Sequence, residues 1–157
     1  MRRKDREIVD NEYINSILDN CMVLHLAMID GDSPYLVPLN FGYDYNEGTY
    51  TFYIHSAKVG KKIEVINKNN KVCIQLDSKT SLLTADKACD YSYYYQSIIA
   101  NGKIYEIVDK QEKSYGLNRI MMQVTKKTFE FEEKGLNAVK VYKISIDTLS
   151  AKEHKSL

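Results

Sequence analysis

Residues 35–68, YLVPLNFGYDYNEGTYTFYIHSAKVGKKIEVINK, join two strand patterns to a lysine-rich helix start. Every second residue from Tyr35 to Tyr43 is apolar, which is typical of a strand with one buried face. Pro38 lacks a backbone N–H and therefore favours an edge or irregular position. The turn-forming residues 46–48 separate this strand from a second predicted strand over 49–55. The stretch predicts a β-hairpin followed by a helix.

The helix behind the second strand has a predicted N-cap and one apolar face. Ser56 carries a side-chain oxygen that can cap the first backbone N–H groups. Val59, Ile63 and Ile66 recur at the spacing of one helical face, so we expect this face to lie on the sheet.

Lysines gather at the start of this helix, at Lys58, Lys61 and Lys62. Free N–H groups and the helix dipole favour negative charge there, so a bound anion such as a phosphate would remove the conflict. Lysines that point into water at a small cost explain the same pattern. The residues alone leave both interpretations open.

The composition predicts one globular domain over residues 1–157. The chain is 44% hydrophobic and carries 22 Lys and Arg against 21 Asp and Glu, which gives a net charge of +1. This balance argues against a general nucleic-acid or membrane-binding surface, so an anion site has to be local. The basic start MRRKDREIVD has no apolar segment behind it, and a cytoplasmic protein is therefore expected.

Cysteine and histidine spacing predicts neither a disulfide framework nor a metal site. The cysteines are odd in number and far apart, and no two histidines share a metal-binding spacing: Cys21, Cys73, Cys89, His25, His55 and His154.

Period and turn signals place the remaining elements. They predict strands over 22–29, 72–76, 96–108 and 138–149, with a bend in the third at Asn101 and Gly102 and a loop over 78–90. A first helix is predicted to be capped by Asp10 and to bury Ile14, Ile17, Leu18 and Cys21. A later helix is predicted to begin with Asp109 and Glu112 and to carry an apolar stripe of Leu117, Ile120, Met121 and Val124. Six strands in mostly sequential order with short helices favour a small antiparallel barrel.

Tyrosines cluster before the long strand, at Tyr91, Tyr93, Tyr94 and Tyr95. They suit an aromatic ligand or a partner interface, and they also suit plain strand packing.

Several segments together resemble the pyridoxamine 5′-phosphate oxidase-like FMN-binding split-barrel family, and within it the nitroimidazole-reductase (Nim-type) branch. They are MRRKDREI (1–8), VPLNFGY (37–43), YIHSAKVGKKIEVI (53–66), YYYQSIIANGKIYEI (93–107) and VYKISIDTLSAK (141–152). The arginine-rich motif of true pyridoxamine phosphate oxidases is absent, which argues against pyridoxamine oxidation.

This resemblance implies a mainly β fold with flanking helices, a six-stranded antiparallel split β-barrel. It implies a homodimer with FMN in a groove at the subunit interface. By position, the residues implied to bind the cofactor are Val37, Pro38, Leu39, Asn40 and Phe41 beside the flavin ring, His55, Ser56 and Ala57 near the ribityl chain and phosphate, Lys61 and Lys62 as counter-charges, and Ser97 from the long strand. No catalytic acid or base and no metal are implied.

The implied activity is an FMN-dependent reduction of small aromatic or nitro compounds, as in nitroimidazole resistance. The electron donor would be NAD(P)H or a separate reductase. Two alternatives stay open: a flavin-binding carrier without turnover, and a haem-binding split barrel in which His154 is the candidate ligand.

Overall fold

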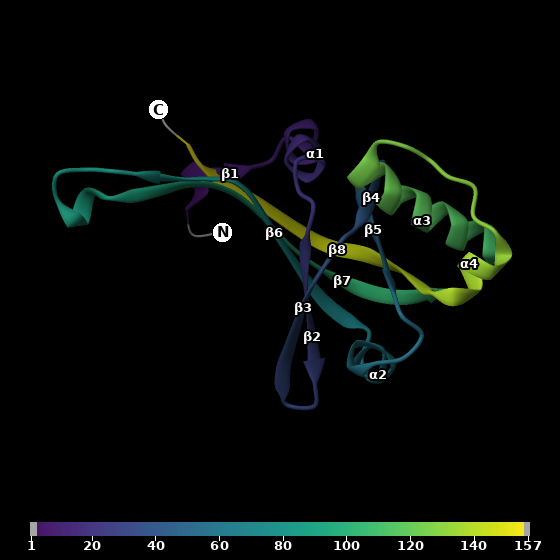
Figure 1. Ribbon diagram of the computed structural model, residues 1–157. Coiled ribbons are helices and arrows are strands. Elements are labelled where there is room, and N and C mark those ends of the chain that lie inside the picture. The colour runs from purple at the N-terminus through teal and green to yellow at the C-terminus, as the bar shows by residue number, and fades with distance from the viewer. Residues whose placement is uncertain (1–2, 156–157) are drawn as a thin grey trace.

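A computed structural model describes residues 3–155 as one antiparallel sheet with helices beside it (Figure 1). The elements are η1 (Lys4–Arg6), β1 (Glu7–Ile8), α1 (Asn11–Asp19), β2 (Leu24–Asp30), β3 (Ser33–Leu39), β4 (Gly42–Asn46), β5 (Thr49–Ser56), α2 (Lys61–Lys68), β6 (Lys71–Leu83), η2 (Ala88–Asp90), β7 (Ser92–Ile107), α3 (Lys110–Thr125), α4 (Glu133–Ala138) and β8 (Lys140–His154). The first two residues of MRRKDREI lie outside the described part.

The strands follow the order β3-β2-β6-β7-β8-β5-β4, and β1 pairs with β8. The predicted mainly β, antiparallel architecture with flanking helices is confirmed, although the described residues form eight strands rather than six. β3 lies at one edge of the sheet and β4 at the other, so the edge position predicted from Pro38 is confirmed. Within residues 3–155, no helix has the length and apolar character needed to cross a bilayer.

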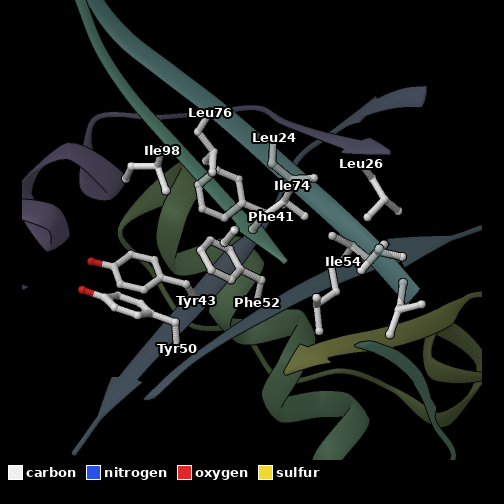
Figure 2. Close-up of a cluster of buried hydrophobic side chains, with 14 of the residues drawn as sticks. Leu24, Leu26, Phe41, Tyr43, Tyr50, Phe52, Ile54, Ile74, Leu76 and Ile98 are labelled. Carbon is white, nitrogen blue, oxygen red and sulfur yellow. The ribbon is translucent and has the colours of Figure 1, made fainter. Parts of the chain in front are cut away.

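The main core lies on one face of the curved sheet, where alternate residues of the central strands point inward (Figure 2). The Phe41 and Phe52 rings lie 5.7 Å apart at its centre, and both side chains are fully buried. Apolar side chains of α1 and α2 complete this core. A smaller cluster under α3 contains Tyr53, Ile107 and Ile120.

The predicted single strand over 35–43 is wrong, because the chain leaves β3 after Leu39 and starts β4 at Gly42. At the break, the Asn40 amide donates to the Met22 carbonyl at 2.9 Å, and Phe41 turns into the core. The apolar alternation continues across the break because Phe41 and Tyr43, which follow β3, are buried as well. The pattern therefore does not show that the strand ends.

The predicted helix start is also wrong. Ser56 is the last residue of β5, and α2 begins at Lys61 with Gly60 as its N-cap. Gly60 has φ 135, a conformation that glycine adopts without strain. Val59 therefore lies before the helix and is 83% exposed, whereas Ile63 and Ile66 are buried as predicted.

The predicted loop over 78–90 is partly wrong, because residues 78–83 belong to β6 and only 84–90 lie outside the strands. β6 continues to Leu83 and β7 begins at Ser92, so these strands form a ribbon that projects beyond the barrel (Figure 1). We call residues 79–94 the arm. Its sequence looked like a loop because neither face of the arm meets the core, so no apolar alternation is required.

Local signals elsewhere were predicted correctly. The Asp10 carboxylate accepts from the Glu12 N–H at 3.0 Å, and the Asp109 carboxylate accepts from the Glu112 N–H at 2.8 Å. The predicted bend in the long strand is a register shift at Asn101/Gly102. The four residues predicted as the buried stripe of the first helix are all buried.

The predicted stripe of α3 is partly wrong, because Val124 is 46% exposed while Gln123 is buried. The Gln123 amide donates to the Leu18 and Cys21 carbonyls at 2.8 and 2.7 Å. This polar residue thus satisfies carbonyl groups at the end of α1, a role that its position in a helical pattern does not indicate.

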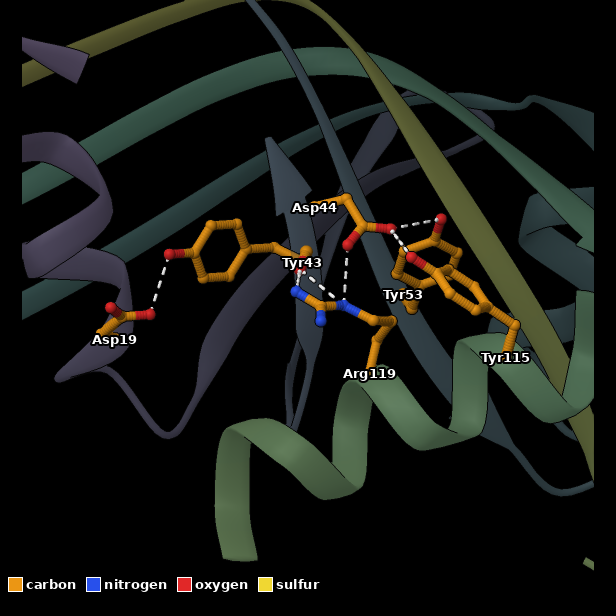
Figure 3. Close-up of polar contacts among 6 residues, drawn as sticks. All are labelled: Asp19, Tyr43, Asp44, Tyr53, Tyr115 and Arg119. Carbon is orange, nitrogen blue, oxygen red and sulfur yellow. Dashed lines mark hydrogen bonds and ion pairs between the residues drawn. The ribbon is translucent and has the colours of Figure 1, made fainter. Parts of the chain in front are cut away.

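Polar contacts fasten α3 to β4 and β5 (Figure 3). The Asp44 carboxylate lies 2.7 Å from Arg119 Nε and accepts from the Tyr53 and Tyr115 hydroxyls at 3.1 and 2.8 Å. Arg119 also donates to the Tyr43 carbonyl. All these groups are paired, so the cluster has a structural role.

A close approach of β4 to α3 gives a test of this packing. A Cβ added at Gly42 would lie 2.2 Å from the carbonyl carbon of Arg119. We expect Gly42→Ala to lower the free energy of unfolding by about 2–3 kcal/mol, because backbone has to move. Gly135→Ala is the control, since a Cβ there meets nothing within 4 Å. Equal urea midpoints for the two variants would contradict the packing described.

Candidate functional site

The start of α2 lies against the β2–β3 hairpin. The Lys61 ammonium is 3.1 Å from the Asp30 carboxylate and 4.7 Å from the centre of the Tyr35 ring. Because α2 follows β5 closely in the chain, these contacts bring the end of β5 and the edge strand β3 to one place. Asp30 and Tyr35 were not among the predicted site residues.

Lys62 adds a positive charge at this place that no carboxylate of the described residues matches. Lys62 is partly buried, and desolvation lowers the pKa of its ammonium. The pKa of His55 is also lowered, first by desolvation and then by the charge of Lys62. Within residues 3–155, no Asp or Glu comes within ion-pair distance of Lys62. An anion here would stabilise the charged form of both groups.

The first turn of α2 adds backbone donors. No side chain caps this helix, and the bonds accepted by the Gly60 carbonyl come from Ile63 and Glu64. The N–H groups of Lys61 and Lys62 therefore have no acceptor among the described residues. Uncapped N–H groups beside a lysine and a histidine form a donor set that fits a phosphate.

The strand predicted to lie beside the flavin ring runs from this charged region along the sheet edge. Val37 and Leu39 are half-buried, while Pro38 and Asn40 are exposed. At the rise of an extended strand, the stretch from Tyr35 to Asn40 spans about 17 Å. Since β3 is an edge strand, one side of its backbone has no strand partner in the described sheet. Phe41, by contrast, is fully buried in the core.

His25 is a neighbour of this strand that the sequence did not single out. It pairs directly with Pro38 on β3 and with Gln75 on β6. Its Nδ1 atom is buried and has no hydrogen-bond partner among the described residues. Only the strand pairing connects His25 to the predicted site, so spacing along the sequence gave no signal.

The remaining predicted residues fall into two places. His55, Ser56 and Ala57 end β5 and lead toward α2, together with Lys61 and Lys62. Ser97 lies elsewhere on the sheet. Val141 on β8 pairs with His55 on β5 and with Ile107 on β7, so His55 and Ile107 lie at the same level of the sheet. Ser97 and Ile107 are ten residues apart on β7, which is about 30 Å in a strand. One chain therefore does not bring Ser97 to the charged region.

Ser97 lines a separate hollow of about 220 Å³ with Glu7, Ile99, Ser150 and Lys152. His154 is the last residue of β8, and its Nδ1 is 2.9 Å from the Tyr93 carbonyl oxygen and 3.4 Å from the Ser92 hydroxyl oxygen. Among residues 3–155, no cluster of three His, Cys, Asp or Glu side chains could hold a metal ion.

Comparison with known proteins agrees with this architecture. Residues 10–153 match the family model described as pyridoxamine 5′-phosphate oxidase. A candidate 5-nitroimidazole antibiotic resistance protein from Bacteroides thetaiotaomicron is 34% identical, with a TM-score of 0.81 over 94% of this chain and 86% of that one. None of the curated proteins compared with the chain matches it significantly.

More distant structures share the fold. A flavocytochrome from Azotobacter vinelandii is 20% identical, with a TM-score of 0.80 over 99% of this chain and 72% of that one. An FAD- and haem-binding protein from Mycobacterium smegmatis is 18% identical, with a TM-score of 0.79 over 96% and 74%. Together with the family match over residues 10–153, these findings show that the chain belongs to the pyridoxamine 5′-phosphate oxidase family of split barrels, in its nitroimidazole-resistance branch.

Proposed function

We propose that this protein binds FMN and uses it to reduce small aromatic or nitro compounds. The main support is the Lys62 ammonium, which has no carboxylate partner among the described residues and lies with the His55 imidazole at the uncapped start of α2. This charge lies beside an edge strand that has free backbone groups. The similarity to a candidate 5-nitroimidazole resistance protein supports the nitro-compound class.

The residues that would hold FMN form two groups, one for its phosphate and one for its ring system. Lys62 and the N–H groups of Lys61 and Lys62 would bind the phosphate, with Ser56 nearby. Lys61 is already paired with Asp30, so its side chain contributes less to the phosphate than Lys62 does. The β3 edge from Val37 to Asn40 would offer backbone groups to the ring system. Redox chemistry would be supplied by the bound flavin, which accepts hydride and passes electrons on.

We further propose a homodimer in which the flavin lies between subunits. Ser97 is about 30 Å along β7 from the level of His55, so it reaches a flavin at the charged region only from a second chain. Large apolar side chains are exposed on the sheet away from the core, at Ile29, Leu36 and Ile99. Such a face is typical of a subunit interface.

The phosphate contact can be tested with two flavins. We expect Lys62→Ala to cost about 1.5–3 kcal/mol of FMN affinity, the scale of a hydrogen bond to a charged group. Riboflavin, which has no phosphate, should bind the variant and the parent protein equally. Titration followed by flavin fluorescence measures both affinities.

Lys58→Ala is the matched control, because Lys58 is exposed and precedes the helix. It should bind FMN like the parent protein. Equal losses of FMN and riboflavin affinity in Lys62→Ala would show that Lys62 does not bind the phosphate.

The pKa of His55 gives an independent test. Without ligand it lies below the ordinary 6.5, so the unfolded chain binds the proton better than the folded chain. Stability should therefore fall as the pH drops through 6.5 toward the folded pKa. FMN should raise the pKa because the phosphate favours the imidazolium, and riboflavin should leave it unchanged. NMR titration of His55 measures the shift; a pKa that FMN does not raise would contradict the proposed phosphate position.

A further inference from the structure

Among residues 3–155, no third strand supports the arm, residues 79–94. β8 pairs with β7 only as far as Tyr95, opposite His154. Beyond that point the described ribbon consists of β6 and β7, and it projects away from the barrel (Figure 1). A two-stranded ribbon is marginally stable in water, so an ordered arm needs a surface to pack on.

The arm carries an apolar side that continues the exposed face of the sheet. Leu82 and Tyr93 are directly paired across the ribbon and are 60% and 48% exposed. Alternation along β7 places Tyr93 on the same face as Tyr95, Ser97 and Ile99. Any molecule that covers this face of the sheet is therefore positioned to meet the arm as well.

The other end of the same face holds an apolar hollow of about 540 Å³. Its lining residues include Ala27, Ile29, Pro34, Val72, Cys73 and Asn101. We call it the groove. It lies where β6 begins, whereas the arm lies where β6 ends, so each chain carries a projection and a hollow at opposite ends of one face.

The groove and the arm tip each carry charged side chains of both signs that form no ion pair within residues 3–155. Lys71 and Lys103 line the groove and stand directly opposite each other on β6 and β7, although like charges in this position repel. Neither forms an ion pair within residues 3–155. The arm tip carries Asp86 and Asp90, both exposed.

The remaining charges fit the same arrangement. Asp32 and Asp147 also line the groove and have no ion-pair partner among the described residues. The arm tip carries the exposed Lys87 between its two aspartates. Docking of the arm tip in the groove would give both signs of charge a partner.

We propose that the arm of one chain docks into the groove of a second copy. A two-fold dimer that turns one sheet end for end over the other makes this contact twice, because both partners present the same face. The inference rests on the proposed homodimer and adds the segment that holds it together. Packing of the two arms against each other is the competing arrangement.

The natural cysteines provide the test. Cys89 is exposed at the arm tip, Cys73 is half-buried in the groove, and Cys21 is buried in the core. Cys73 and Leu83 are ten residues apart on β6, which is about 33 Å, so a short reagent cannot join Cys73 to Cys89 within one chain. A short bismaleimide should produce a covalent dimer. The dimer should be lost in Cys73→Ala and in Cys89→Ala and kept in Cys21→Ala.

Other outcomes would overturn the proposal. A covalent dimer that survives Cys73→Ala but not Cys89→Ala would place the arms against each other. A dimer by light scattering that the reagent does not cross-link would show that the arm lies outside the groove. The absorbance of FMN bound to the same samples distinguishes failure of arm docking from failure of the proposed function. Bound flavin without the cross-link would refute arm docking and leave the proposed function standing. Absence of bound flavin would refute the proposed function.

Discussion

The crossing of the chain at residues 40–41 is the constraint on which the rest of the structure depends. β3 and β4 follow each other in sequence but lie at opposite edges of the sheet, so the sheet curls around the core without closing into a continuous barrel. Phe41 fills the centre of the core at the crossing. Gly42 allows α3 to approach the start of β4, where a Cβ would overlap the helix backbone.

The proposed ligand site lies at this open edge. β3 keeps one side of its backbone unpaired in the sheet, and α2 closes one end of the opening through the contact of Lys61 with Asp30. The helix brings its uncapped N–H groups and Lys62 to the same place as His55. Charge and free backbone donors thus collect where the fold cannot complete its own hydrogen bonds, which is the basis of the proposed FMN site.

Features that depend on neighbouring residues could be predicted from the sequence. The Asp10 and Asp109 caps, the hairpin at residues 46–48 and the bulge at Gly102 each arise within a few residues. The lysines of α2 were also visible, although the residue that caps the helix was not. The resemblance to the family came from several such segments in order.

Features that depend on distant partners were missed. The break at Asn40 leaves the apolar alternation intact, so the pattern predicted one strand where there are two. Burial of Gln123 makes sense only beside the carbonyls of Leu18 and Cys21, about a hundred residues earlier in the chain. His25 joins the candidate site only through its pairing with Pro38. The arm looked like a loop because its strands have no core to face.

FMN binding and turnover can be read from the visible spectrum of the protein after FMN addition and removal of free ligand. We expect a yellow protein with one flavin per chain, bleached by NADH, NADPH or a flavin reductase and restored by a nitroaromatic acceptor. A colourless protein would contradict the proposed FMN binding. A yellow protein that no donor bleaches would leave flavin binding without the proposed reduction.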